Sequence, residues 1–200
     1  MPLNVPNLLT WLRILTIPLV VGVFYVPETL LSMGHKNVIA TAMFGAAAVT
    51  DWLDGYLARR LNQMSAFGAF LDPVADKLMV AGALIVLVEL ERVYAFIAVV
   101  IIGREIAISA LREWMAKTGQ AKSVAVNLLG KVKTISQMIA IPLLLYHEPL
   151  GLLNPQLVGT WLIYLAAVLT LVSMFYYLKL SLAPREAGDR RRLDRRGSGP

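Results

Sequence analysis

Long apolar stretches are the feature that most constrains the fold of this chain. Hydrophobic residues make up 58% of its 200 residues and charged residues only 16%, whereas a typical soluble domain carries about 25% charged residues. A helix needs about 20 largely apolar residues to cross a bilayer. Stretches of roughly this kind lie at 8–27, 38–60, 73–90, 93–116, 124–146 and 157–180. The sequence therefore predicts an all-α, polytopic membrane protein with six transmembrane helices, in one domain over residues 1–182.

The two ends of the chain call for separate interpretations. Residues 1–26 lack a basic leading segment and a small-residue cleavage site, and Arg13 interrupts them. We therefore expect a retained first helix and not a removed signal peptide. Residues 183–200 are polar and contain five clustered arginines, a composition typical of disordered segments. We expect a disordered basic cytoplasmic tail there, either solvated as a positive anchor or in contact with anionic lipid.

The distribution of lysine and arginine indicates the orientation in the membrane, because cytoplasmic loops are enriched in both. With the N terminus inside and six spans, only Lys36 and Arg92 of the 19 basic residues lie outside. Both termini are then cytoplasmic, as is the acidic region between the second and third stretches. This bias accounts for the net charge of +6, so we predict membrane lipids and no nucleic acid as partners.

Four aspartates occur in the stretch DWLDGYLARRLNQMSAFGAFLDPVAD, residues 51–76. A carboxylate at membrane depth costs about 2.5–3.5 kcal/mol on insertion scales, so these residues need compensating partners. Asp51 and Asp54 are three residues apart and share one helix face. Asp72 and Asp76 are four residues apart and share another. Two antiparallel helices joined by a turn would bring the four carboxylates together.

Four converging carboxylates repel one another unless cations lie between them. The chain has no cysteine, and its two histidines are far apart in the sequence. Oxygen ligands alone favour hard divalent cations. We predict two Mg²⁺ ions, with Mn²⁺ or Ca²⁺ as alternatives, in the arrangement that clamps a phosphate group during displacement. The small residues Gly55, Ala58 and Gly68 would let a ligand approach the backbone, and Arg59 suits a phosphate oxygen.

Together these residues resemble the signature of the CDP-alcohol phosphotransferase family, D-x2-D-G-x2-A-R-x8-G-x3-D-x3-D. Every fixed position is filled, by Asp51, Asp54, Gly55, Ala58, Arg59, Gly68, Asp72 and Asp76. The resemblance implies a six-helix membrane enzyme, usually a homodimer, that binds two divalent metals and a CDP-linked lipid. It implies that all four aspartates lie at the metal centre and that Asp76 is the catalytic base. It assigns the binding of CDP to Asp54, Gly55, Ala58, Arg59 and Gly68.

The signature does not specify the acceptor alcohol, but other segments do. The opening NVPNLLTWLRI and the segments 101–116 and 123–138 resemble family members that use glycerol 3-phosphate, and the resemblance extends over residues 4–180. A small dianion needs basic groups near the membrane surface. We predict that its phosphate binds Arg104, Arg112, Lys131 and Lys133. Lys122 is a weaker candidate, and some of these side chains could instead snorkel or pair with nearby glutamates.

The resemblance thus implies transfer of the phosphatidyl group of CDP-diacylglycerol to glycerol 3-phosphate, giving phosphatidylglycerol phosphate and CMP. We expect this reaction at the cytoplasmic face of a bacterial inner membrane. The main alternative is a related enzyme with another acceptor, such as a cardiolipin synthase or a phosphatidylserine synthase. A cation transporter would use the aspartates as an ion path but would leave Gly55, Ala58 and Arg59 unexplained. A non-catalytic membrane scaffold is less favoured still.

Overall fold

The computed structural model describes residues 5–60, 66–117 and 128–182. Some side chains within these ranges, including those of 52–59, Arg112 and 176–182, lie outside the described part. The predicted tail at 183–200 lies outside the described residues. Six long helices and one short 3-10 helix make up the described chain, which confirms the predicted all-α class. They are α1 (Val5–Gly22), η1 (Val23–Tyr25), α2 (Met33–Arg60), α3 (Ala66–Glu89), α4 (Ala95–Lys117), α5 (Leu128–Tyr146) and α6 (Pro155–Leu182).

The third helix begins earlier than its apolar stretch indicates. The prediction started this span at Pro73, yet α3 begins at Ala66 and carries Pro73 in its interior. A proline removes only one backbone hydrogen bond and bends the helix, and such breaks are tolerated in apolar helices where neighbouring groups compensate. The two aspartates of this helix therefore lie well inside it, and not at its first turn.

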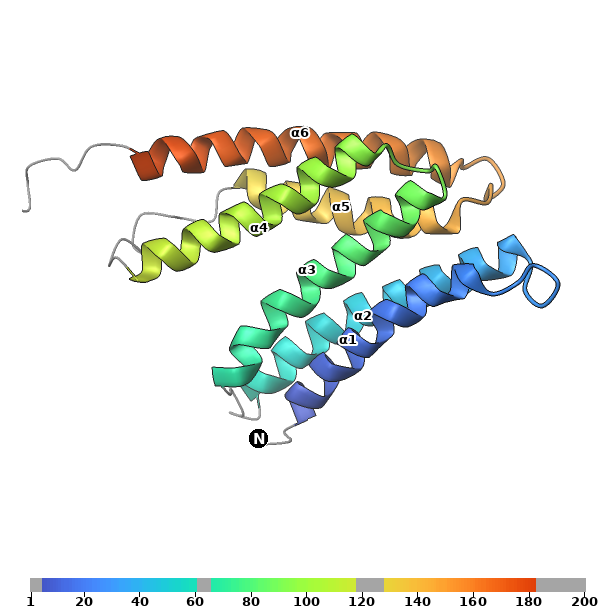
Figure 1. Cartoon of the computed structure of the whole chain (residues 1–200), viewed down its shortest axis with the longest axis horizontal. Helices are drawn as coiled ribbons and strands as arrows, with labels where there is room; N and C mark the ends of the chain where they lie inside the picture. The colour runs from blue at the N-terminus through green and yellow to red at the C-terminus, as the bar shows by residue number, and fades with distance from the viewer. Residues whose placement is uncertain (1–4, 61–65, 118–127, 183–200) are drawn as a thin grey trace, which may run out of the picture.

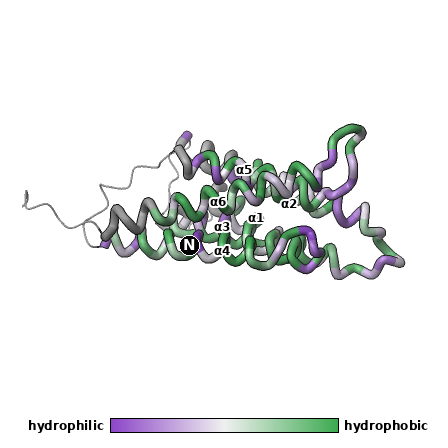
Figure 2. The backbone as a smooth tube through the Cα atoms, turned by 90° about the horizontal axis from the view of Figure 1, so that it is seen from above, coloured by the Kyte–Doolittle hydropathy of each residue, from purple (hydrophilic) through white to green (hydrophobic). Residues whose placement is uncertain are grey.

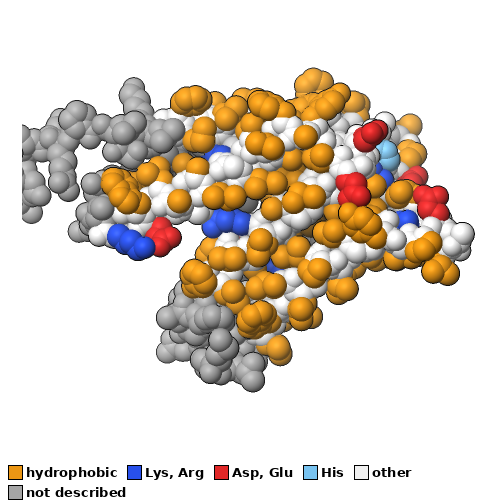
Figure 3. Space-filling view, in the orientation of Figure 1, with side chains coloured by type: hydrophobic (Ala, Val, Ile, Leu, Met, Phe, Trp, Pro, Cys, Tyr) orange, Lys and Arg blue, Asp and Glu red, His pale blue; other side chains and the backbone are white. Residues whose placement is uncertain are grey.

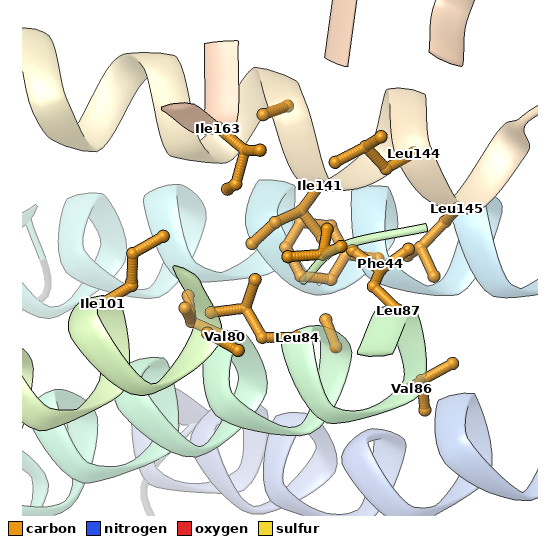
Figure 4. Close-up of a cluster of buried hydrophobic side chains, with 14 of the residues drawn as sticks. Phe44, Val80, Leu84, Val86, Leu87, Ile101, Ile141, Leu144, Leu145 and Ile163 are labelled. Carbon is orange, nitrogen blue, oxygen red and sulfur yellow. The ribbon is translucent and has the colours of Figure 1, made fainter. Parts of the chain in front are cut away.

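The six helices converge at one end of the molecule and diverge at the other. Figure 1 shows α1, α2 and α3 separating from α4, α5 and α6 toward the end at which the N terminus lies. The largest buried side chains pack where the two groups of helices meet (Figure 4), among them Phe44 of α2, Leu84 and Leu87 of α3, and Ile141 of α5. This core fixes the position of α3, the helix that joins the two groups.

Apolar side chains also cover much of the outer surface. Leu8, Leu12, Leu15 and Leu19 of α1 are all exposed, and Figure 3 shows hydrophobic side chains spread over the face in view. Two stretches of the described chain, Leu8–Tyr25 and Pro155–Phe175, are long and apolar enough to cross a membrane by length and composition. In Figure 2, hydrophobic residues predominate along the helices and many hydrophilic ones lie near the connecting loops.

Arg92, in the loop between α3 and α4, holds the convergent end together. Its Nη1 donates to the carbonyl oxygens of Leu144 (3.1 Å) and Leu145 (2.8 Å), and its Nη2 donates to Asn37 Oδ1 at 2.8 Å. The last carbonyl groups of a helix have no partner within the helix, and a cation there also interacts favourably with the helix dipole. Arg92 therefore caps α5 and ties it to α2.

His147 makes the folding stability of this convergent end depend on pH. It follows α5 with a positive φ of 60°, and burial lowers its pKa below the ordinary value of 6.5, with the Arg92 charge acting in the same direction. The unfolded chain therefore takes up a proton before the folded one does, so stability is lost as the pH falls below 6.5. Asparagine tolerates positive φ, and we expect His147→Asn to remove this part of the loss. Thermal unfolding in detergent at pH 7.5 and 5.5 measures it, and an equal loss in both proteins would contradict the assignment.

Gly159 allows α6 to approach α5 closely. A Cβ atom at this position would lie 2.8 Å from Leu144 Cγ and 3.2 Å from the carbonyl oxygen of Ala140. We expect Gly159→Val to destabilise the protein by about 1–3 kcal/mol, because overpacking forces neighbouring groups apart. Gly103→Val is the matched control, since a Cβ there meets nothing within 4 Å. Equal unfolding midpoints for the two variants would show that this contact does not limit stability.

Candidate active site

Three of the four predicted aspartates contact α1 at the divergent end. Arg13 Nη1 lies 2.6 Å from Asp51 Oδ1 on α2 and 3.1 Å from Asp76 Oδ1 on α3. Thr10 Oγ1 donates to Asp72 Oδ1 at 2.6 Å. The Arg13 side chain is 0% exposed, whereas those of Asp51 and Asp76 are 32% and 40% exposed. The structure therefore brings two carboxylates, one from α2 and one from α3, into contact with one buried cation. Both carboxylates remain partly exposed to solvent.

The part played by α1 was missed in the sequence. Arg13 was noted only because it interrupts an apolar stretch, and Thr10 was given no role. Two signals could have identified them. The two residues are three apart and so share a helix face, and an arginine within an apolar span is expected to pair with a carboxylate.

We call Asp51, Asp72 and Asp76 the aspartate cluster. Their oxygen donors fit a hard divalent cation, although the complete metal centre stays a prediction. The single positive charge of Arg13 cannot balance Asp51, Asp72 and Asp76, so a further cation would relieve their repulsion. Within the described residues, no three candidate ligands lie close enough together to hold a metal ion. The side chain of the fourth predicted ligand, Asp54, lies outside the described part.

The predicted CDP site falls largely outside the described side chains. Gly55, Ala58 and Arg59 belong to α2, but nothing beyond their place in this helix is described. Gly68 is described and is buried in the first turn of α3. Because α2 and α3 follow one another and both carry residues of the cluster, the predicted CDP residues lie on the same two helices as the aspartates.

A cavity of about 240 Å³ opens beside Asp76, between α3, α4 and α5. Its charged lining consists of Asp76, Lys77, Arg104, Glu105 and Lys133, and Gln137 also lines it. Figure 3 shows basic side chains in the hollow between α4 and α3. The cavity thus places a carboxylate of the aspartate cluster and three basic residues, Lys77, Arg104 and Lys133, around one small volume.

Two buried cations share one carboxylate in the wall of this cavity. Lys133 Nζ bonds to Glu105 Oε1, and Arg104 Nη1 lies 3.8 Å from the same oxygen. Arg104 Nη2 also donates to Ser173 Oγ of α6 at 2.9 Å. Arg104 and Lys133 are both buried. This pairing leaves an excess of positive charge, which suits a bound anion.

The four predicted acceptor residues do not all lie at the cavity. Arg104 and Lys133 line it, but Lys131 is exposed and is absent from the lining. Residues two apart on a helix point about 200° apart, so Lys131 and Lys133 face opposite ways. The side chain of Arg112 and the whole of Lys122 lie outside the described part. The alternative expectation, that some of these basic side chains pair with a nearby glutamate, also applies to Arg104 and Lys133, because Glu105 contacts both.

Comparison with known proteins identifies the family. A model of the CDP-alcohol phosphatidyltransferase family matches residues 3–172. Proteins from Escherichia coli (strain K12) and Shigella flexneri serotype 5b (strain 8401) are each 48% identical over 185 residues, which cover 92% of this chain and 97% of the relative. Both are named CDP-diacylglycerol--glycerol-3-phosphate 3-phosphatidyltransferase. The family predicted from the aspartate signature is confirmed, and the chain belongs to the CDP-alcohol phosphatidyltransferases.

Proposed function

We propose that this chain transfers the phosphatidyl group of CDP-diacylglycerol to sn-glycerol 3-phosphate, which gives phosphatidylglycerol phosphate and CMP. The names of its relatives support both substrates. The observation that carries the proposal is that one cavity is lined by Asp76, from the aspartate signature, and by the buried cations Arg104 and Lys133. A proton acceptor and a phosphate-binding pair therefore lie side by side, as this acceptor requires.

The acceptor binds through its phosphate to Lys133 and Arg104, with its C1 hydroxyl directed toward Asp76. Asp76 takes the hydroxyl proton as general base. The oxygen attacks the phosphorus that carries the diacylglycerol. The bond from this phosphorus to the oxygen of the CMP group breaks, and CMP leaves with the bonding electrons. Holding the acceptor hydroxyl in a fixed position beside Asp76 supplies part of the rate increase.

The four signature aspartates are proposed to hold two Mg²⁺ ions. When bound, these ions would supply charge neutralisation on the pyrophosphate of the donor. Asp54, Gly55, Ala58, Arg59 and Gly68 are proposed to hold the CDP group, and Arg59 is suited to the charge on the leaving phosphate. The oxygen-only donors of the cluster and the position of Asp51 and Asp76 on one cation support this arrangement.

We further propose six membrane spans with both termini in the cytoplasm of a bacterial cell, and a homodimer as the family resemblance implies. The charge distribution supports the orientation. The aspartate cluster and the cavity lie in the divergent half, whereas Arg92 binds at the opposite end of α5. The divergent end then faces the cytoplasm, where the water-soluble acceptor is available. The exposed apolar side chains of the helices are suited to contact lipid.

A comparison of acceptors tests the proposed function against its main alternative. Purified protein in detergent would receive CDP-diacylglycerol and Mg²⁺ with glycerol 3-phosphate, serine, inositol phosphate or phosphatidylglycerol, and CMP release would be measured. We expect release above the acceptor-free background with glycerol 3-phosphate alone. Release with one of the other alcohols, and none with glycerol 3-phosphate, would retain the family chemistry and overturn the acceptor.

A further inference from the structure

We propose that Thr10 and Arg13 of α1 are positioning residues for the aspartate cluster. They would fix the orientation of carboxylates that α2 and α3 bring to the site, and would thereby set the affinity for the metal. This inference rests on the metal centre of the proposed function. It assigns to α1, which carries none of the signature residues, a defined part in the reaction.

Thr10 and Arg13 contact a single oxygen of each of these carboxylates in the described part of the chain. Thr10 and Arg13 are one helical turn apart and are both buried. They engage Oδ1 of Asp72, Asp51 and Asp76. Within the part of the chain that the structure describes, no contact uses Oδ2 of Asp51 or Asp72. One oxygen of each of these carboxylates is thus held by α1, and the other is available to a ligand.

Fixed carboxylates bind metal ions better than freely rotating ones. The groups that hydrogen-bond to a metal ligand orient it, and their loss typically costs about 10–100-fold in metal affinity. Asp51 and Asp76 both contact the same nitrogen of Arg13, Nη1. Arginine suits this position better than lysine, because its rigid planar guanidinium fixes the direction of that nitrogen whereas an ammonium group rotates freely. Its charge also lets two acidic helices approach each other before a metal arrives.

Thr10→Val isolates this effect because it removes a hydrogen-bond donor without changing charge or volume appreciably. Thr10→Ser keeps the hydroxyl and is the conservative control. Thr16→Val is a matched control on the same helix, since the Thr16 hydroxyl donates to the carbonyl oxygen of Leu12 at 2.8 Å and contributes nothing to the cluster. Arg13→Lys keeps the charge and loses the planar guanidinium, which provides a second test should Thr10→Val fail to fold.

The measurement is Mn²⁺ binding to each purified protein in detergent, without donor lipid, by the electron paramagnetic resonance signal of free Mn²⁺. We expect Thr10→Val and Arg13→Lys to weaken binding by about 10-fold or more, while Thr10→Ser and Thr16→Val bind as the wild type does. Thermal unfolding in EDTA would show Thr10→Val folded, which separates lost affinity from lost structure.

Wild-type or tighter Mn²⁺ binding by both Thr10→Val and Arg13→Lys would overturn the positioning role and leave the proposed function intact. Absence of Mn²⁺ binding by the wild type would instead overturn the metal centre itself, and this inference with it. The two failures are therefore distinguishable from the wild-type titration alone.

Discussion

Replacing Asp76 by asparagine is expected to abolish phosphatidyl transfer while the protein remains folded. An amide cannot take the proton of the acceptor hydroxyl, and a positioned general base typically contributes about 10²–10⁴-fold to the rate. Asparagine has nearly the same shape, and its oxygen can still accept a hydrogen bond from Arg13, which lies 3.1 Å from the present carboxylate. CMP release and thermal unfolding, measured on the same preparation, test the two parts of this expectation.

Two further variants test whether the effect of Asp76→Asn is specific to the role of Asp76 as the base. Glu89→Gln changes an acidic residue at the last position of the same helix, where Glu89 accepts a hydrogen bond from Tyr25 at 2.8 Å. We expect this variant to retain full activity. Asp72→Asn should lower the rate and also raise the Mg²⁺ concentration required. Near-normal turnover by Asp76→Asn would show that another group accepts the proton.

Replacing Lys133 by glutamine is expected to raise the KM for glycerol 3-phosphate by about 10–100-fold, since a hydrogen bond to a charged group contributes about 1.5–3 kcal/mol. The affinity for CDP-diacylglycerol should stay unchanged, because Lys133 lies on α5 at the acceptor cavity and not among the signature residues. Rates measured over a range of acceptor concentrations, at saturating donor, separate KM from kcat.

Lys131→Gln is the matched control for Lys133. Lys131 lies two residues from Lys133 on the same helix, carries the same charge and is exposed. We expect its KM for glycerol 3-phosphate to equal that of the wild type. A large effect of Lys131→Gln, with none for Lys133→Gln, would move the acceptor phosphate to the other face of α5 and contradict the proposed cavity.

Much of the fold and the outline of the site could be predicted from local patterns. Each of the six predicted apolar stretches corresponds to a helix of the described chain. Two of these helices contain a stretch long and apolar enough to cross a membrane by length and composition. The start of α3 was placed too late because Pro73 suggested a helix boundary. A proline weakens a helix without necessarily ending it, and the residues that precede Pro73 continue the helix back to Ala66.

Local patterns could indicate that Arg13 needs a carboxylate partner but not which carboxylate it contacts, because such contacts join distant segments. Thr10 and Arg13 lie about 60 residues from Asp72 and Asp76 in the chain, and no spacing rule connects them. The choice between Lys131 and Lys133 depends on which face of α5 turns toward α3 and α4. Only the packing of the helices determines that, because both lysines have the same chemistry and the same local sequence environment.

Transfer of label from glycerol 3-phosphate into lipid tests the central claim most directly. Purified protein in detergent would be given CDP-diacylglycerol, Mg²⁺ and labelled glycerol 3-phosphate, with an EDTA-treated sample as the control. The proposal predicts label in the lipid phase, an equal amount of CMP, and neither product in EDTA. Absence of label from the lipid phase in the presence of Mg²⁺, with a protein that is folded and binds the donor, would contradict it.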